Sequence, residues 1–352
     1  MKYTTITSVI RRAAVYAVAV VAALSAASCD SMIYDEEGDC DPHYKVRFKY
    51  DRNLKYSDAF AAEVKEVTLY IVDDATGKVI WQKHESGEQL RSGSYLMDVD
   101  VEPGTYTLVA WCGEGHTSSF SVADAEHYSG LQCRLLERGE HPGFDFEGSA
   151  VRKDLGDLYH GKLTAQKFPN DQGTHVYTID LTKDTNYLHV VLQHLSGDPV
   201  EEKFTFTVVE ENGFMDWDNS LLPDEQLTYY AHTVRNGYAG VDVPDYRGDG
   251  EGNESRAITA VSACVADLTM GRLMADRKSM VRIYNPDKEL VASIPLQDYA
   301  LMTKGKHQQL SDQDYLDYRD DYSMVLFLDD NGRWISTTIY INSWMIVKQT
   351  VD

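Results

Sequence analysis

The sequence predicts an all-β protein with two tandem β-sandwich domains and minor helical segments, and three observations support this fold class. The chain has 352 residues, a length at which polypeptides commonly divide into two domains, each with its own hydrophobic core. Its 23 tyrosines outnumber its nine prolines and occur among short apolar runs, a composition typical of strands. Those runs follow one another at short intervals, separated by turn residues, which favours sandwiches over alternating strands and helices.

The first strand is predicted at residues 44–50, the stretch YKVRFKY. Val46 and Phe48 fall on one face of an extended chain, and the basic residues around them fall on the other. This alternation is typical of a strand with one face in a core and one face in water. We therefore expect the first domain to begin here.

Two strand pairs are predicted next. Residues 66–82 contain two β-rich runs around a turn at Gly77, and residues 94–113 repeat this pattern around Pro103 and Gly104. We expect each pair to form a hairpin. One face of the last of these runs carries Tyr106, Leu108, Ala110 and Cys112.

The domain boundary is predicted near Gln172, which divides the folded part of the chain into domains at 44–172 and 173–352. A long loop is expected at 133–148, because that stretch is rich in Gly, Arg and acids. Residues 242–256 are rich in Gly and acids and are expected to form an exposed loop. The sequence does not decide whether this loop contains a ligand or ion site. Strands of the second domain are expected at 175–182, 186–195, 202–210, 257–268, 279–285 and 289–296.

The C-terminal stretch predicts a helix followed by three strands. Ser311 is positioned to cap a helix, with Asp314 reaching back to it. Asn331 and Gly332 stand between two strongly apolar runs, which is a firm hairpin signal. A final strand is expected to contain Trp344, Ile346 and Val347.

Residues 1–28 are typical of a secretory signal peptide: basic residues come first, an apolar run at 13–24 follows, and small residues close the segment. The apolar run is short for a membrane span, although a short N-terminal anchor is the alternative. Cys29 directly follows the small residues, as the acylated cysteine does in bacterial lipoprotein signals. We therefore expect lipidation of Cys29, with residues 29–43 as an acidic tether.

The charge of the chain argues against nucleic-acid binding. Removal of residues 1–28 deletes three basic residues and no acid, which takes the formal net charge from −23 to −26. Such an acidic chain repels phosphate backbones and anionic lipid surfaces.

Four cysteines remain if Cys29 is acylated. In an exported protein, Cys40, Cys112 and Cys133 are candidates for disulfides, and the sequence leaves their pairing open. Cys264 lies within an apolar run, so we expect it to be a buried thiol.

The sequence contains no motif of a metallopeptidase, a nucleophile elbow or a phosphate-binding loop. His189 and His194 lie five residues apart on one predicted strand, so they face opposite sides and would not share an ion. The acidic stretches 215–219 and 329–332 lack the ligand ladder of an EF-hand and are better explained as turns. We expect a non-enzymatic protein with no cofactor and no metal.

Several stretches together resemble the FimB family of fimbrial anchor subunits of Bacteroidetes. They include EVTLYIVDDATGKVI and YLMDVDVEPGTYTLVAWCG in the first half, and LTKDTNYLHVVLQHLSG and IYINSWMIVKQ in the second. The resemblance covers most of the chain after the signal peptide. It implies tandem β-sandwiches of the transthyretin-like type, held at the cell surface by an outer-membrane lipid such as palmitate on Cys29.

The resemblance also implies a role in a fimbrium. Shaft subunits of similar proteins are trimmed at an arginine after the lipidated leader, which removes the first strand and opens a groove for a neighbour's strand. Here residues 29–43 contain no arginine, and the first one, Arg47, lies within the predicted first strand. We therefore expect the lipidated end to stay attached, the first domain to stay closed, and the chain to anchor a fimbria and limit its length.

Partners and an alternative role complete the expectations. Fimbrial shaft subunits are the expected partners, with strand addition near Trp344, Ile346 and Val347 as the candidate contact, although these residues also suit a plain core strand. The alternative is a surface lipoprotein that binds a glycan or a host ligand through β-sandwich loops. A surface glycosidase would need two carboxylates at catalytic separation in a cleft.

Overall fold

The structure is a computed structural model that describes residues 41–113, 119–194, 200, 203–239, 261–307, 309–329, 331–335, 338–341 and 344–347. Most of these residues belong to one compact unit, which comprises Tyr44–Pro169 and His175–Asp352. Asn170–Thr174 and the described residues before Tyr44 are assigned to a second unit.

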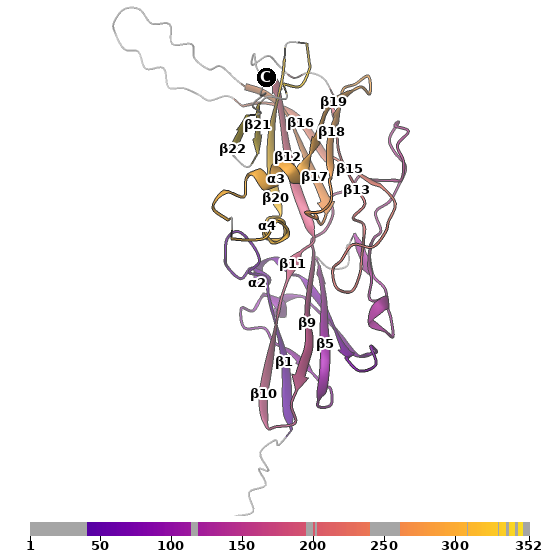
Figure 1. Ribbon diagram of the computed structural model, residues 1–352, viewed down its shortest axis with the longest axis vertical. Helices are drawn as coiled ribbons and strands as arrows, with labels where there is room; N and C mark the ends of the chain where they lie inside the picture. The colour runs from indigo at the N-terminus through magenta and orange to yellow at the C-terminus, as the bar shows by residue number, and fades with distance from the viewer. Residues whose placement is uncertain are drawn as a thin grey trace, which may run out of the picture. The chain divides into compact units, whose positions relative to one another are not determined.

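The described chain is all-β, as predicted, and its strands form sheets that Figure 1 shows as ribbons. Sheet A has the order β10-β1-β4 and sheet B the order β11-β9-β5-β2-β3. Their strands are β1 (Pro42–Lys49), β2 (Glu66–Asp73), β3 (Val79–Ser86), β4 (Met97–Val99), β5 (Gly104–Gly113), β9 (Leu158–Phe168), β10 (Gly173–Asp180) and β11 (Thr182–Lys183).

Three further sheets contain the remaining strands. Sheet C has the order β14-β7-β6, sheet D the order β19-β18-β13-β15-β8, and sheet E the order β16-β17-β12-β20-β21-β22. Their strands are β6 (Phe120–Val122), β7 (Cys133–Leu135), β8 (Ser149–Val151), β12 (Thr185–His194), β13 (Thr205–Glu210), β14 (Phe214–Met215), β15 (Leu227–Tyr230), β16 (Thr233–Ala239), β17 (Val261–Gly271), β18 (Met280–Tyr284), β19 (Leu290–Pro295), β20 (Asp321–Leu328), β21 (Thr338–Ile341) and β22 (Trp344–Val347).

Helices in the described residues are short. The α-helices are α2 (Phe60–Glu63), α3 (Leu296–Met302) and α4 (Asp312–Tyr318), and the 3₁₀ turns are Glu88–Arg91, Tyr128–Gly130 and Gly305–His307. None of these helices is long and apolar enough to cross a membrane.

Two hydrophobic cores organise the sheets. The first lies between sheets A and B and contains Val46 and Leu69, neither of which is exposed. The second lies between sheets D and E and contains Leu188 and Val208. Each core removes apolar surface from water, which is the main favourable contribution to folding.

Sheet B contributes to both cores, because β5 is apolar on both of its faces. Leu108 and Ala110 belong to the first core, whereas the alternating residues Val109 and Trp111 belong to the second. A strand that is buried on both faces has a nearly continuous apolar sequence. The stretch LVAW in β5 has this character.

Several local predictions are confirmed. β1 buries Val46 and Phe48 and leaves Arg47 exposed. β2 and β3 form an antiparallel hairpin whose turn contains Gly77 at φ +72°. Ser311 caps α4, because its Oγ accepts a hydrogen bond from the backbone N–H of Asp314 at 3.0 Å.

The C-terminal hairpin is also present. β20 and β21 are antiparallel, and Gly332 in the connecting turn has φ +72°, a conformation that favours glycine. β22 then pairs with β21 in an antiparallel register.

Two sequence-based predictions are wrong. β4 and β5 do not form a hairpin: β4 pairs with β1 in sheet A, and β5 pairs with β2 and β9 in sheet B. The stretch 133–148 is not a continuous loop, since it opens with β7, which pairs with β6 and β14. Both errors concern pairing with distant strands, which a short stretch of sequence does not encode.

Strand pairing also crosses the expected boundary at Gln172 in both directions. β10 lies after that residue but joins β1 in sheet A, and β8 lies before it but pairs in parallel with β15 in sheet D. The two cores are therefore built from interleaved segments of the chain. The division into domains at 44–172 and 173–352 stays a prediction.

Candidate functional site

A run of five polar residues connects the strands of the first core to those of the second. Thr182–Asn186 lies between β10 and the body of β12, and every residue in it is at most 7% exposed. We call this segment the joint. The sequence predicted only a break between two strands here, at 183–185.

One charged side chain of the joint is Lys183, which is surrounded by carboxylates. Its Nζ lies 2.9 Å from Asp320 Oδ2, 3.1 Å from Asp157 Oδ1 and 4.0 Å from Glu63 Oε2. Burial lowers the pKa of Lys183, but the carboxylates of Asp320 and Asp157 outweigh it and the pKa is raised above its ordinary value. Lys183 is therefore a buried cation.

Two tyrosine rings enclose this cation. Nζ of Lys183 lies 5.7 Å from the ring centroid of Tyr159 and 5.0 Å from that of Tyr187, within cation–π range. The Tyr187 hydroxyl donates to Asp157 at 2.9 Å, and the Tyr159 hydroxyl lies within hydrogen-bond distance of both Asp157, at 3.2 Å, and Glu63, at 3.1 Å. The carboxylate is thereby held in place by groups other than the lysine.

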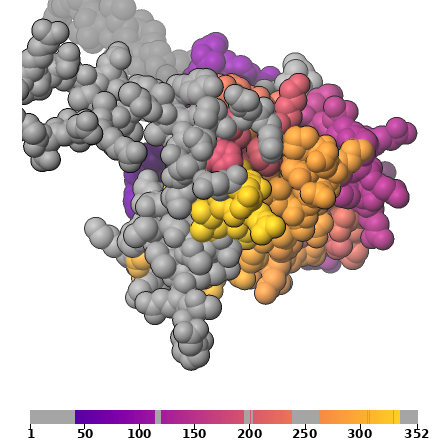
Figure 2. Space-filling model, turned by 90° about the horizontal axis from the view of Figure 1, so that it is seen from above, coloured from indigo at the N-terminus to yellow at the C-terminus, as the bar shows by residue number. Residues whose placement is uncertain are grey.

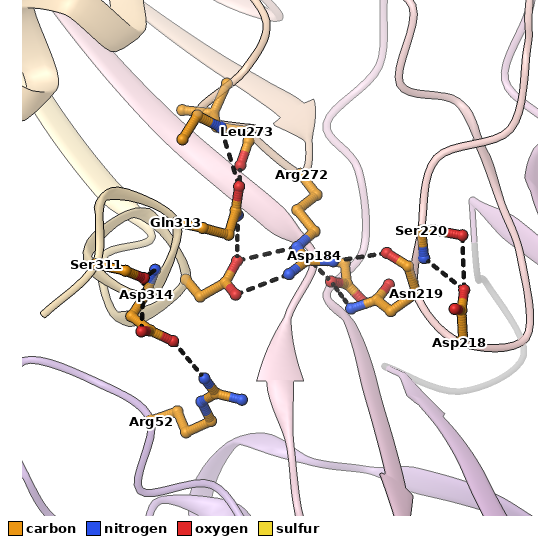
Figure 3. Close-up of polar contacts among 12 residues, drawn as sticks. Arg52, Asp184, Asp218, Asn219, Ser220, Arg272, Leu273, Ser311, Gln313 and Asp314 are labelled. Carbon is orange, nitrogen blue, oxygen red and sulfur yellow. Dashed lines mark hydrogen bonds and ion pairs between the residues drawn. The ribbon is translucent and has the colours of Figure 1, made fainter.

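A second ion group surrounds Asp184 of the joint, and Figure 3 shows its polar contacts. Arg272 follows β17 and makes a two-point contact with Asp317 of α4, at 3.0 Å from Nε and 2.7 Å from Nη2. Its Nη1 donates to the backbone oxygen of Asn219 at 2.6 Å, and its Nε lies 3.7 Å from Asp184 Oδ1. A planar guanidinium suits such a multiple contact.

Asp184 is the more deeply buried of the two titratable residues of the joint, with no exposed surface. Its Oδ1 accepts a hydrogen bond from Asn219 Nδ2 at 2.8 Å, and its backbone N–H donates to Leu158 O at 2.7 Å. Burial raises the pKa of Asp184 to about 7, although Arg272 and Asn219 lower it. Asn219 has φ +71°, a conformation that asparagine adopts more readily than most residues.

The helix α4 brings a further ion pair to the first core. Asp314 accepts a hydrogen bond from the Ser311 hydroxyl, and its other oxygen accepts one from Arg52 Nη2 at 3.0 Å. Figure 3 shows Arg52 reaching Asp314 from the segment that follows β1. Asp314 therefore reaches back to the Ser311 side chain, as expected for the cap, and also pairs with a residue distant in sequence.

None of the ionic residues of the joint was singled out from the sequence. Their partners, such as Asp157, Arg272 and Asp320, come from other elements, so local spacing does not reveal the contacts. The one local signal is a lysine and an aspartate side by side within a short polar run between two apolar strands. Burial of such a run requires that its charges be paired or neutralised.

The cysteines of the described chain are free thiols. Cys112 belongs to the first core and Cys133 to the second, and no disulfide joins either of them there. Cys264 is a buried thiol, as predicted, and burial raises the pKa of all three, that of Cys264 to about 11. Cys29 and Cys40 lie outside the described residues.

The predicted C-terminal contact residues lie on β22. Ile346 pairs with Ile339 and Val347 with Thr338, so the backbone of β22 is held by β21. β22 ends the strand order of sheet E in the described residues. Figure 2 shows orange and yellow segments, which come late in the described chain, beside each other on one surface. This placement leaves the role of Trp344, Ile346 and Val347 as contact residues a prediction.

In shaft subunits of similar proteins, removal of the first strand opens a groove for a neighbour's strand, so the position of β1 in this chain is relevant. β1 is the central strand of sheet A, between β10 and β4. Its Val46 is fully buried in the first core, and Phe48 is 2% exposed. β1 is therefore an integral, buried part of sheet A in the described chain.

The acid-rich turns act as turns, as expected. Asp218 accepts hydrogen bonds from the backbone N–H and hydroxyl of Ser220, and Asp329 accepts from the backbone N–H groups of Asn331 and Arg333. The described residues contain no group of three or more potential ligands placed to hold a metal ion.

An aromatic group, missed by the sequence reasoning, lies on the loop before β8. The ring centroids of Phe144 and Phe146 are 4.7 Å apart, and that of Phe144 is 5.1 Å from Tyr284. Lys288 Nζ lies 5.7 Å from the Phe144 ring. Both phenylalanines are half-buried, so part of each ring faces water. The signal in the sequence is the alternation FDF within a glycine-rich stretch.

A family model matches most of the chain. The model described as "Fimbrillin-A associated anchor proteins Mfa1 and Mfa2" matches residues 36–350. No curated protein matches the chain.

Solved structures of Bacteroidetes proteins are similar to this one over nearly their whole length. A proposed adhesin of Bacteroides thetaiotaomicron is 27% identical, with a TM-score of 0.74, and the match covers 89% of this chain and 100% of that one. A proposed polysaccharide-binding protein of the same organism is 26% identical, with a TM-score of 0.69 and coverage of 88% and 99%. The fimbrial anchor protein Mfa2 of Porphyromonas gingivalis shares the fold, with 16% identity, a TM-score of 0.59 and coverage of 88% and 100%.

Proposed function

The chain belongs to the family of fimbrillin-A associated anchor proteins Mfa1 and Mfa2, and from this premise we propose that it anchors a fimbria to the outer membrane. The family gives the chain a fimbrial accessory role at the cell surface, together with other fimbrial proteins. In our proposal it is the membrane-bound end of the fimbria, has no enzymatic activity, and limits fimbrial length.

The observation that carries this proposal is the extent of the family match. Residues 36–350 include both cores, the joint and β22, so the match is not confined to one domain. The central position of β1 supports a terminal role, because a subunit whose groove is already filled does not accept a neighbour's strand there. Arg47 within β1 is consistent with a leader that stays attached.

Acylation of Cys29 would supply the attachment. Acyl chains contribute about 0.8 kcal/mol per buried methylene, and stable binding takes more than one chain. Mass spectrometry of the mature N-terminus tests this directly: we expect a chain that begins at an acylated Cys29. An unmodified terminus at any other residue would refute the attachment.

Recovery of fimbrial subunits tests the anchoring itself. The chain would be tagged in the predicted loop 242–256 and purified from intact cells after mild cross-linking. We expect fimbrial shaft subunits to be recovered with it, in cross-links that include the C-terminal strand. Recovery of the chain without any fimbrial subunit, from cells that carry fimbriae, would contradict the proposal.

A second candidate function is glycan binding through the loop that contains Phe144 and Phe146. Aromatic rings that are partly exposed present the apolar faces on which sugars stack. The similarity to a proposed polysaccharide-binding protein favours this candidate. A glycan array separates glycan binding from anchoring. Glycan binding that is lost in the double variant Phe144→Ala, Phe146→Ala would favour this second function if no fimbrial subunits are recovered with the chain.

A further inference from the structure

Two neighbouring buried side chains, one in the joint and one in the segment after β14, each have an oxygen atom with no hydrogen-bond partner. These atoms are Oδ2 of Asp184 and Oδ1 of Asn219. The other two polar atoms of these groups are paired, because Asp184 Oδ1 accepts from Asn219 Nδ2 at 2.8 Å. Oδ2 of Asp184 is bonded to the same carboxyl carbon as the paired Oδ1, and Oδ1 of Asn219 is bonded to the same amide carbon as the paired Nδ2. A carboxylate and an amide carbonyl have no hydrogen to share between these two oxygens, and unpaired buried polar atoms are costly.

We propose that Asp184 is a neutral carboxylic acid at neutral pH, and that its Oδ2–H donates to Asn219 Oδ1. Together with the existing contact, this closes an acid–amide ring with two hydrogen bonds. A carboxylic acid offers one donor and one acceptor side by side, and a primary amide offers the complementary pair. One retained proton therefore satisfies both unpaired oxygens, and no additional group is required.

The charges around Asp184 are compatible with a neutral acid. Arg272 is the nearest cation, with Nε at 3.7 Å, but it makes its two-point contact with Asp317. Lys183, the neighbour in the chain, is paired with Asp157, which precedes β9, and with Asp320, which precedes β20. Asp218 precedes Asn219 but is hydrogen-bonded to its own turn.

A further element that contacts Asp184 is β9, where Leu158 O accepts its backbone N–H. Asp157 and Tyr159 flank Leu158 and contact Lys183, and the next residue is His160, whose Nε2 lies 2.9 Å from Trp217 O. His160 is 3% exposed, and burial lowers its pKa to about 3, so it brings no charge to the joint. Complete burial of Asp184 itself also favours the neutral form and raises its pKa to about 7.

The consequence is a proton-dependent contact between Asp184 and Asn219, which lie in separate segments of the chain. The segment that carries Asn219 follows sheet C, and Asp184 lies between β11 and β12, so the ring ties the joint to a distant part of the chain. Loss of the proton would place a carboxylate oxygen opposite an amide oxygen, and the ring would open. This inference does not depend on the proposed anchoring role.

The experiment follows the carboxyl carbon of Asp184 by NMR in the folded chain without its signal peptide, labelled with ¹³C at aspartate Cγ. The variant Asp184→Asn identifies the signal, and Asp218→Asn, which changes the acid next to Asn219, is the matched control. The Asp184 signal is the one that is absent from Asp184→Asn and retained in Asp218→Asn. We expect its titration midpoint to lie about three pH units above that of an ordinary aspartate. A signal already ionised at pH 5 would overturn the proposal.

A measurement on the unsubstituted protein keeps the test valid if Asp184→Asn does not fold. Infrared spectra of the same labelled protein would be compared between pH 6 and pH 8.5. We expect a label-sensitive carbonyl band of a protonated carboxylic acid at the lower pH and its loss at the higher pH. Absence of that band at pH 6 would equally overturn the proposal.

Discussion

At the scale of single residues, the joint depends on cations that are buried with their counter-charges. Lys183 has 5% of its side chain exposed and contacts Asp157 and Asp320. Removal of one member of a buried ion pair leaves the other uncompensated, which is more harmful than the loss of a surface pair. Asp320 is about one-third exposed, so water compensates part of that loss.

We therefore expect Lys183→Met to lower the free energy of unfolding by roughly 2–4 kcal/mol. Lys45→Met is the matched control, because Lys45 pairs with Asp98 on the surface. That pair is worth about 0–1 kcal/mol. Urea unfolding of both variants measures the difference, and equal effects would show that the Lys183 contacts contribute no more than an exposed pair.

The raised pKa of Asp184 gives stability a defined dependence on pH. The unfolded chain loses this proton near the ordinary value of about 3.9, whereas the folded chain retains it to about pH 7. The stabilising contribution of Asp184 is therefore complete below about pH 4, falls as pH rises through 7, and is constant above.

We expect the free energy of unfolding of the unsubstituted chain to fall relative to that of Asp184→Asn between pH 5 and pH 7. The slope is at most about 1.4 kcal/mol per pH unit. Denaturant titrations at several pH values measure it. Parallel curves for the two proteins across this range would contradict the assignment.

At the scale of elements, β1 determines whether the first core is closed. Its two faces differ sharply: Val46 is fully buried and Arg47 is exposed. We expect Val46→Asp to destabilise the chain by about 4 kcal/mol or more, because it buries an unpaired charge at the centre of sheet A. Arg47→Asp, one residue away, should change stability by about 0.5 kcal/mol or less. Thermal unfolding of the two variants checks the strand assignment, which fails if their effects are similar.

Elements with local signals were predictable from the sequence. The alternation in β1, the glycine at the β2–β3 turn, the Ser311 cap and the turn at Asn331 each involve residues within a few positions of one another. Their physical causes are local as well: burial of one face, a positive φ, and a side chain that accepts a backbone hydrogen bond.

The joint and the sheet assignments were not predictable in this way. The runs that became β4 and β5 suit a hairpin, and only packing against β1 and β9 places them in different sheets. The run TKDTN is polar, and its burial depends on charges beside β9 and β17 and within α4, which come from other parts of the chain. A single sequence shows the charges but not which of them meet.

At the scale of the whole molecule, the proposed anchor is attached to the membrane through Cys29 and binds the fimbria at a second place. β22 is the candidate for this second place, since it closes the strand order of sheet E in the described residues. We expect deletion of residues 344–352 to release fimbriae while the chain stays on the cell. Circular dichroism must show retained β structure, and immunoblots of cells and medium locate both components. Fimbriae that stay attached to cells expressing this shortened chain would remove β22 from the proposal.

The attachment of the chain to the cell is the central claim. Cys29→Ala removes the acceptor for acyl chains, and Cys40→Ala changes a neighbouring cysteine in the same acidic segment as a matched control. The decisive measurement is the distribution of the chain and of fimbriae between cells and medium in these two strains. We predict that Cys29→Ala sheds both into the medium and that Cys40→Ala retains both on cells. Retention of the chain and its fimbriae on Cys29→Ala cells would contradict the account.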